Sequence, residues 1–473
     1  MENSTSQSMN QALPNEDDLV GRFFRLAIAN VLSNIMVPMA NTLSVAFLGH
    51  LSEIHHLAGV ALAGNLTSLV FLLLSSLRMS TTGLTAQAVG RDDREAMLLV
   101  VLRNALIALV LGVTIISLKY PLQELGFSLL NANPQIEASG IAYFNAQIWG
   151  TPAVLLNFVL IGWFIGREKN GLVVLLSLVG NVANIALDYL LIIRWGWESM
   201  GAGVSYSTSQ YLTLLVGLIV LCVEIKWQEL RTVAAKILDT SAIISSFNLG
   251  GNIFVNNFIF ILTLLIFNYE SAAQGTIIYA ENALLLQVIF LSSYFVEGVG
   301  FGTEALSGNF KAKQASEQLV ALVRISVGTS LLVGLISALV CVLFPQTVFG
   351  LLTNHTEITE QIDIYVFWLL PMLGFSSVAY ILDGYFLGLT EGHTLRNVSF
   401  ASFALGFLPA NIAAFSFHTN TNHILWLALS LFLLMRMVLF GIQVPRTFEF
   451  QIPHPTLSES VINETLPENK LCN

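Results

Sequence analysis

Residues 325–344 read ISVGTSLLVGLISALVCVLF, twenty consecutive positions without a charged side chain. A helix rises about 1.5 Å per residue, so this stretch can cross the ~30 Å hydrocarbon core of a bilayer. Comparable apolar segments fall near residues 22–48, 57–88, 96–117, 135–166, 171–194, 201–225, 241–268, 275–306, 317–344, 358–390, 395–417 and 422–444. The sequence therefore predicts about twelve membrane-spanning helices.

The composition excludes a soluble protein. Hydrophobic residues make up 55% of the 473 positions and charged residues only 11%, whereas soluble domains carry about 25% charged residues. In lipid, backbone groups must be hydrogen-bonded within helices or closed barrels, and barrel strands are segments of only about ten residues. The fold class is therefore an all-α polytopic membrane protein embedded in the lipid bilayer. We expect a monomer that binds no nucleic acid.

The basic residues of the loops predict the topology. By the positive-inside rule, loops rich in Lys and Arg stay in the cytoplasm. The loops between the other ends of the segments hold only Lys119 and Arg194. Basic residues are frequent in three other places: the amino terminus, the loops after even-numbered segments and the region beyond the last segment. They are Arg22, Arg25, Arg91, Arg94, Arg167, Lys169, Lys226, Arg231, Lys236, Lys311, Lys313, Arg396 and Arg446. We therefore expect both termini to be cytoplasmic, in the plasma (inner) membrane.

An internal repeat divides the chain into two halves. The pairs of matching segments, each offset by roughly 220 residues, are Thr85–Gly90 with Thr303–Gly308, Gly162–Gly166 with Gly384–Gly388, Asn30 and Asn34 with Asn248 and Asn252, and Ala183–Ala186 with Ala410–Ala413. We predict an amino-terminal tail (1–21), a six-helix bundle (22–225), an amphipathic cytoplasmic linker (226–240), a second six-helix bundle (241–444) and a cytoplasmic tail (445–473). Parallel repeats of this kind are a known transporter architecture, with the substrate path between the halves.

The clearest candidate for ion coupling is Asp188, an acidic residue inside the 171–194 segment. Ionisable residues in membrane spans are costly and are functional candidates by default. Asn184 lies four residues earlier, on the same helical face. A carboxylate beside an amide can hold a proton or coordinate Na⁺. The alternatives are a structural hydrogen bond between helices, or a side chain that reaches the outer interface near Arg194. In the second half the matching Asn411 is followed by Phe415 instead of an acid.

A second candidate group consists of Arg78, Glu297 and Asp383. Counting along their segments places all three in the cytoplasmic half of the membrane. One cation and two carboxylates could form an inner gate that breaks when the protein opens inward, or a static ion pair that fixes packing. Glu304, near the cytoplasmic end of the same segment as Glu297, is expected to be solvated.

Asparagines mark a candidate cavity wall. Asn248, Asn252 and Asn256 are spaced four residues apart and so lie near one helical face. They line either a central cavity, together with Asn34, or a contact between helices. Pro38 interrupts the hydrogen-bond ladder of the 22–48 segment and is a candidate hinge.

Enzymatic and nucleotide-driven functions lack their motifs. The run Gly298–Gly302 follows no strand and has no P-loop lysine, and no HExxH, GxSxG or paired Cys/His set occurs. We expect neither an enzyme nor a bound cofactor or metal. The energy for transport would come from an ion gradient or from the gradient of the substrate itself.

Several motifs resemble those of MATE (multidrug and toxic compound extrusion) transporters, in the branch named after DNA-damage-inducible protein F. The resemblance covers roughly residues 22–445. It is carried by LRMSTTGLTAQAVG at 77–90, Val37–Pro38, FLGHL at 47–51, the stretch from Gly180–Asn181 to Leu187–Asp188, EALSG at 304–308 and LDGYFLG at 382–388. It implies two helical bundles forming a V around a central cavity, and export of cationic or amphipathic organic solutes in exchange for H⁺ or Na⁺.

The resemblance also implies a cation site in the first half. Asn184 and Asp188 match it, whereas the family's aspartate in the first helix is replaced by Ser44 and its Thr/Ser in the sixth by Tyr206. Asn41 completes this candidate set. A single carboxylate suits a proton better than a dehydrated Na⁺.

We therefore predict a secondary active efflux transporter for organic solutes, a proton antiporter working by alternating access. One alternative is a facilitator or lipid-linked flippase of the wider superfamily with altered ion coupling. Another is a membrane sensor or scaffold that does not transport.

Overall fold

The computed structural model describes residues 16–128, 133–353, 362–416 and 421–448. Within these ranges, twelve helices are long and apolar enough to cross a membrane. They begin and end within a few residues of the predicted segments, apart from extensions such as Thr276–Ala312, which runs six residues beyond the predicted 306. The all-α polytopic fold is confirmed.

The helices of the first half are α1 (Glu16–Gly49), α2 (Ile54–Leu74), α3 (Ser76–Gly90), α4 (Arg94–Ser117), α5 (Lys119–Ser128), α6 (Pro134–Gln147), α7 (Thr151–Gly166), α8 (Asn170–Asp188), α9 (Glu198–Glu224) and α10 (Trp227–Ala234). Those of the second half are α11 (Thr240–Ala273), α12 (Thr276–Ala312), α13 (Ser316–Leu343), α14 (Pro345–Gly350), α16 (Leu369–Gly388), α17 (Gly392–Ser402), α18 (Leu408–Ser416) and α19 (Thr421–Gln443). Pairs such as α2–α3 and α6–α7 each form one membrane span.

Capping residues explain where several spans begin. The side chain of Asp93 accepts a hydrogen bond from the amide of Ala96 (2.9 Å) at the start of α4. The side chain of Asp239 likewise accepts a hydrogen bond from the amide of Ser241 (3.0 Å) at the start of α11. Asn133 caps α6, where Pro134 opens the helix. These side chains bond amides that a helix amino terminus leaves free, and proline lacks an amide proton there.

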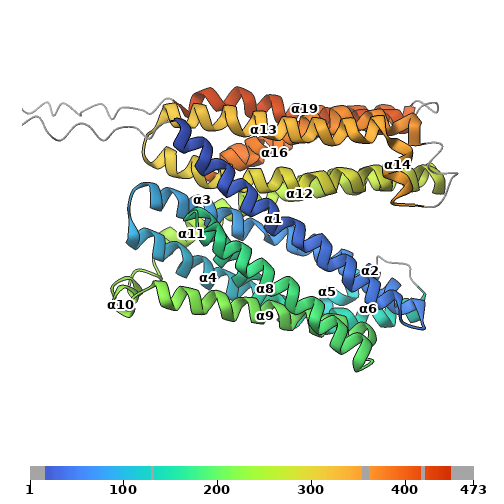
Figure 1. The fold of residues 1–473 in the computed structure, drawn as a ribbon, viewed down its shortest axis with the longest axis horizontal. Helices are drawn as coiled ribbons and strands as arrows, with labels where there is room; N and C mark the ends of the chain where they lie inside the picture. The colour runs from blue at the N-terminus through green and yellow to red at the C-terminus, as the bar shows by residue number, and fades with distance from the viewer. Residues whose placement is uncertain (1–15, 129–132, 354–361, 417–420, 449–473) are drawn as a thin grey trace, which may run out of the picture.

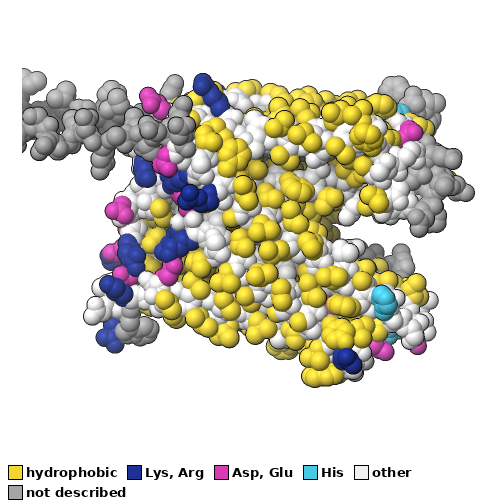
Figure 2. Space-filling model, in the orientation of Figure 1, with side chains coloured by type: hydrophobic (Ala, Val, Ile, Leu, Met, Phe, Trp, Pro, Cys, Tyr) yellow, Lys and Arg dark blue, Asp and Glu magenta, His cyan; other side chains and the backbone are white. Residues whose placement is uncertain are grey.

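The helices form two groups that lie close together at one end and diverge at the other. Figure 1 shows α12, α13, α16 and α19 in one group and α3, α4, α8 and α9 in the other. Figure 2 shows Lys and Arg side chains concentrated at the end where the groups converge, and a hollow between the groups at the opposite end. The arrangement is the V that the resemblance implied.

Helix α1 belongs to both groups. It crosses obliquely between them in Figure 1 and packs mainly on α12 and α8. Near its start, Phe23 and Leu26 are buried in a core that contains Phe310 and Leu382 of the second half. Near its end, Leu48 joins a core of the first half. The predicted unit 22–225 does not describe this sharing, and the division into bundles stays a prediction.

Glycine pairs give the internal repeat its physical basis. Gly162 and Gly166 on α7 lie directly against the backbone carbonyls of Arg78 and Thr82 on α3. In the second half, Gly384 and Gly388 on α16 lie in the same way against backbone carbonyls of α12. A side chain at these positions would overlap the facing backbone, so the close approach requires glycine. Each half thus packs its fourth span on its second.

The linker contains a short helix, α10, which packs against the amino-terminal part of α4. Arg94 Nη2 lies 2.9 Å from Glu229 Oε2, and Arg103 Nη2 donates to the carbonyl of Lys236 (2.6 Å). The hydrogen bond from Arg94 holds the pKa of the half-buried Glu229 carboxyl below its usual range. The linker is therefore fixed to the first half at the Lys/Arg-rich end.

Candidate functional site

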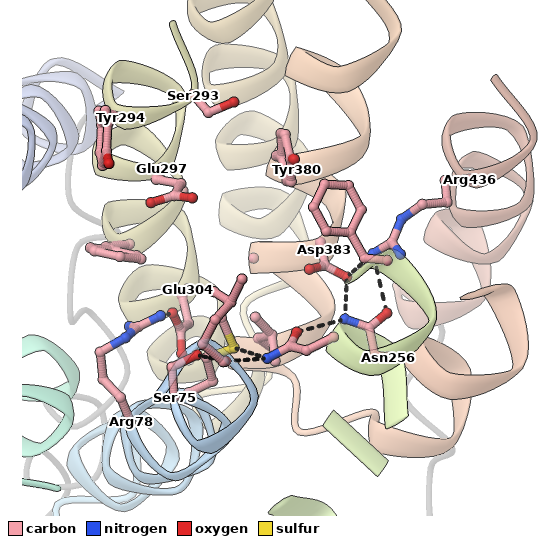
Figure 3. Close-up of a pocket in the computed structure, with 18 of the residues that line it drawn as sticks. Ser75, Arg78, Asn256, Ser293, Tyr294, Glu297, Glu304, Tyr380, Asp383 and Arg436 are labelled. Carbon is pink, nitrogen blue, oxygen red and sulfur yellow. Dashed lines mark hydrogen bonds and ion pairs between the residues drawn. The ribbon is translucent and has the colours of Figure 1, made fainter. Parts of the chain in front are cut away.

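A cavity of about 380 Å³ lies where the two halves meet. It is lined by side chains from α3, α11, α12, α16 and α19 (Figure 3). Its charged lining residues are Arg78, Glu297, Glu304, Asp383 and Arg436. Aromatic and apolar side chains form most of the remaining wall, including Phe260, Phe290, Tyr294, Phe301 and Tyr380. The cavity thus combines an apolar wall with buried charges, as sites for amphipathic ligands do.

One side of the cavity is a hydrogen-bonded network around Asp383. Arg436 Nη2 lies 2.8 Å from Asp383 Oδ1 and also donates to Asn256 Oδ1 (3.1 Å). Arg436 Nη1 donates to Ser399 Oγ (2.9 Å), and Ser399 in turn donates to Asn256 Oδ1. Figure 3 shows Asp383, Asn256 and Arg436 converging from α16, α11 and α19. The network neutralises Asp383 and joins four spans of the second half, those that contain α11, α16, α17 and α19.

The opposite side holds a second ion pair. Arg78 Nη1 on α3 lies 3.5 Å from Glu304 Oε2 on α12, so this pair joins the two halves. The guanidinium of Arg78 also lies 4.0 Å from the ring centroid of Phe301, a cation–π contact. Glu304 is only 1% exposed. The prediction that Glu304 is solvated is therefore wrong, because helix packing encloses this end of α12.

Glu297 lies between Tyr294 and Glu304 along α12. It faces the cavity one turn from Tyr294 on α12, with Tyr380 of α16 across from it (Figure 3). Within the described residues it makes no hydrogen bond or ion pair. It is therefore a cavity carboxyl group that no arginine neutralises by direct contact.

The three residues of the predicted inner gate line one cavity, but they do not pair with one another in this structure. Arg78 pairs with Glu304, and Asp383 pairs with Arg436. Arg436 was missed, although it is an arginine inside an apolar segment and meets the criterion that identified Arg78. The gating role itself stays a prediction.

The candidate coupling site surrounds Asp188, which is 1% exposed at the end of α8. Ser44 of α1 donates a hydrogen bond to Asp188 Oδ2, so the residue that replaces the family aspartate directly contacts the remaining one. Asp188 Oδ1 is buried and has no hydrogen-bond partner among the described residues. Asn184 Nδ2 donates to Ser205 Oγ (2.8 Å) on α9. The free oxygen fits a bound proton.

The helix changes form directly after Asp188. Residues Tyr189–Arg194 form a π-helix, whose wider turn often marks functional sites. The π-helix of the second half, Phe403–Phe407, instead precedes the matching Asn411. The two halves therefore differ in backbone form around these positions as well as in the acid.

The other members of the candidate sets make separate contacts. Tyr206 stacks on Phe71, with ring centroids 6.2 Å apart, and Asn41 is exposed. Asn34 Nδ2 lies 3.4 Å from the carbonyl of Tyr294 and so joins α1 to α12.

Of the asparagine stripe on α11, only Asn256 lines the cavity described above. Asn248 is exposed, and the side-chain amide of Asn252 donates a hydrogen bond to the backbone carbonyl of Asn248 (2.9 Å). Pro38 lies within α1 without ending the helix, so its role as a hinge stays a prediction.

Contacts that the sequence did not predict close the Lys/Arg-rich end. Arg22 at the start of α1 pairs with Glu168, between α7 and α8, and Asn309 Nδ2 of α12 donates to the same carboxylate (3.3 Å). Gln87 Nε2 of α3 donates to Thr390 Oγ1 (3.0 Å), just after α16. These bonds connect the first half to the second where the groups converge.

Comparison with known proteins agrees with this geometry. The family model MatE matches residues 30–190 and 251–412, once in each half. DNA damage-inducible protein F of Escherichia coli K12 is 32% identical over 422 residues, covering 87% of this chain and 89% of that protein. A probable multidrug resistance protein NorM of Thermotoga maritima is 24% identical, over 74% of this chain and 76% of that protein.

Solved structures share the fold at low sequence identity. An outward-facing multidrug resistance MATE family transporter of the MOP superfamily superimposes with a TM-score of 0.82 at 17% identity, covering 93% of this chain and all of that one. A MOP superfamily transporter from Pyrococcus furiosus gives a TM-score of 0.81 at the same identity, covering 93% of this chain and 98% of that chain. The chain therefore belongs to the MatE family: it is an integral multi-pass membrane transporter and not an enzyme.

Proposed function

We propose that this transporter exports amphipathic organic cations in exchange for protons by alternating access. The observation that carries the proposal is the cavity between the halves, where Glu297 remains without a direct cationic partner among the described residues. We further propose that it works as a monomer in the plasma membrane, with both termini in the cytoplasm.

The charge of the cavity supports a cationic substrate. Two arginines and three carboxyl groups line it, which leaves one negative charge in excess when all are ionised. Because Arg78 and Arg436 contact Glu304 and Asp383, the excess falls at Glu297. Tyr294 and Tyr380 offer aromatic faces on either side of it, and such faces attract cations. The apolar wall would hold the remainder of an amphipathic molecule.

The surroundings of Asp188 support a proton as the coupling ion. Its contacts are the Ser44 hydroxyl and a nearby amide–hydroxyl pair, Asn184 with Ser205. Na⁺ would require several oxygen ligands to replace its hydration shell, whereas one carboxylate oxygen suffices for a proton. Protonation from outside would remove the charge and weaken the contact with Ser44. That contact holds α1, which also packs on the second half.

Alternating access requires a closure that can break. The bonds among Arg22, Glu168 and Asn309 join the halves at the Lys/Arg-rich end. They are a better candidate for the inner gate than Arg78 with Asp383, since they cross between the halves near the end of the molecule.

Efflux measured in proteoliposomes tests the proposal. With an imposed pH gradient, the wild type should drive accumulation of a lipophilic cation such as ethidium, and Glu297→Gln should lower its apparent affinity. Glu95→Gln, at the exposed pair with Lys236 far from the cavity, is the matched control. If accumulation of the cation did not depend on the imposed pH gradient, proton coupling would be refuted. Unchanged affinity in Glu297→Gln would refute the cation site.

A second cavity is relevant to the alternative function of a lipid-linked flippase. About 280 Å³ of space lies between α3, α4 and α11, lined mainly by apolar side chains such as Leu77, Ile107 and Phe254. Such a cavity would suit a lipid chain, which favours the lipid-linked flippase. Movement of a fluorescent lipid across the bilayer without any gradient would support that function instead.

A further inference from the structure

Two histidines and two carboxylates meet at the end of the molecule opposite the Lys/Arg-rich end. Glu53 precedes α2, His55 and His56 lie in the first turn of α2, and Glu198 begins α9. Figure 2 shows histidine side chains at this end. None of these residues lines the central cavity or contacts Asp188. The cluster is therefore separate from the transport site.

The side chains are close enough to share one ion. One potential ligand atom each from Glu53, His55 and His56 lies within 4.8 Å of the other two. His55 Nδ1 lies 3.1 Å from Glu53 Oε2, and His56 Nε2 lies 3.0 Å from Glu198 Oε2. In a tetrahedral zinc site with bonds of about 2.0–2.2 Å, neighbouring ligand atoms are roughly 3.3–3.5 Å apart. Glu53, His55 and His56 are near that spacing, and Glu198, which contacts His56, would have to rotate towards the other two to become the fourth ligand.

His56 is held in place by a residue outside the cluster. The other ring nitrogen of His56, Nδ1, lies 2.9 Å from Ser199 Oγ. Metal-binding histidines almost always use their second nitrogen in such a hydrogen bond, which fixes the ring orientation. The rings of His55 and His56 lie 4.2 Å apart although the residues are adjacent in sequence. Both rings thus face the same small region between α2 and α9.

We propose that Glu53, His55, His56 and Glu198 bind a divalent transition-metal ion, with Zn²⁺ as the best match. Two imidazoles with carboxylates suit zinc, whereas Mg²⁺ and Ca²⁺ prefer all-oxygen shells. The ligands come from the segment after α1 and from the start of α9. A bound ion would tie the outer end of α1 to α9 and limit its movement. The proposal does not depend on the transported solute or on proton coupling.

Zinc binding by the purified full-length protein in detergent is the direct test, measured by competition with a chromogenic chelator. The wild type should bind one Zn²⁺ per chain and no Mg²⁺. His55→Ala and His56→Ala should each weaken binding by at least about 100-fold, because loss of a direct ligand exceeds the 10–100-fold effect of an outer-shell partner. His50→Ala is the matched control. That histidine lies in the same loop, where its ring contacts the carbonyl of Ala46.

Two further measurements distinguish loss of a zinc ligand from misfolding of a variant. Glu53→Gln with Glu198→Gln keeps the size of both side chains, and should abolish the rise in melting temperature that Zn²⁺ gives the wild type. X-ray absorption of the zinc-loaded protein should show two imidazoles with oxygen ligands. Absence of binding by the wild type, unchanged affinity in His55→Ala, or a sulfur-containing shell would each overturn the proposal.

Discussion

At the scale of single residues, the acidic side chains inside the spans divide into those with a direct ionic partner and those without. Asp383 and Glu304 each face an arginine. Glu297, by contrast, faces the cavity with no direct ionic partner among the described residues, and one oxygen of Asp188 is likewise unbonded. Asp188 is buried and Glu297 is half-buried, and a charge removed from water without a partner is unfavourable unless it binds a ligand or a proton. We therefore propose that Asp383 and Glu304 are structural and that Glu297 and Asp188 take part in transport.

Asp188→Asn should abolish proton-driven efflux. The amide keeps the shape and the hydrogen bond with Ser44, but it cannot gain or lose a proton. In the wild type, lowering the external pH should accelerate efflux, because protonation of Asp188 from outside is the step that lets substrate leave. In the variant, efflux in proteoliposomes should be independent of external pH. A variant that kept the wild-type pH response would show that the coupling proton binds elsewhere.

Asp383→Asn should destabilise the protein by about 3–5 kcal/mol, because it leaves the buried Arg436 without its counter-charge. Adding Arg436→Gln should recover part of this loss, as measured by a double-mutant cycle on unfolding. The cross-pair Arg78→Gln with Asp383→Asn is the control and should give no recovery, since Arg78 contacts Glu304. Recovery by the cross-pair would instead support a direct pairing of Arg78 with Asp383.

At the scale of helices, close packing and end contacts decide what can move. Each half packs a glycine-bearing helix tightly on its neighbour, α7 on α3 and α16 on α12. Side-chain bonds at the Lys/Arg-rich end then join the halves. Packed helices of this kind move as rigid units, whereas a few polar bonds can break and reform. Opening should therefore act on the end contacts.

Gly388→Ala should lower the melting temperature, because the added methyl group meets the carbonyl of Glu304 and the Ser307 hydroxyl. Overpacking of this kind costs about 1–3 kcal/mol. Gly441→Ala on α19 is the matched control, since no atom lies within 4 Å of its added methyl group. It should leave stability unchanged or raise it slightly. Equal melting temperatures for the two variants would contradict the packing argument.

Glu168→Gln should shift the protein towards a state open at the Lys/Arg-rich end, because it removes the charge that Arg22 contacts. Spin labels at Arg91→Cys and Lys313→Cys, with the three native cysteines replaced by serine, would report the distance between the halves. The distribution should gain a longer component. Glu229→Gln, which breaks the pair with Arg94 at the linker, serves as the control and should not change it.

At the scale of the whole molecule, the structure has a charged end, an apolar middle and a hollow at the opposite end (Figure 2). The apolar surface matches the hydrocarbon core of a bilayer. The Lys/Arg-rich end is the one that the positive-inside rule assigns to the cytoplasm. The same end is where the helix groups converge, so we predict that this conformation is open towards the outside.

Labelling from outside intact cells should establish the orientation. In a variant without native cysteines, a membrane-impermeant maleimide should modify Ala273→Cys at the end of α11 and leave Arg91→Cys unlabelled. Both positions are exposed, so accessibility on its own cannot explain a difference. After permeabilisation both should react. The reverse pattern would contradict cytoplasmic termini.

The sequence by itself determined the spans, the repeat, the family and the isolated acid at Asp188. Hydrophobic length is a local property of the chain, and the motifs that carry the family are short contiguous runs. Only the tertiary structure decided which charges meet. Glu304 reaches Arg78 across 226 positions and Arg436 reaches Asp383 across 53, and no local pattern encodes such partners. The sharing of α1 between the halves, and the cluster that joins Glu53 to Glu198, likewise follow from how the helices cross.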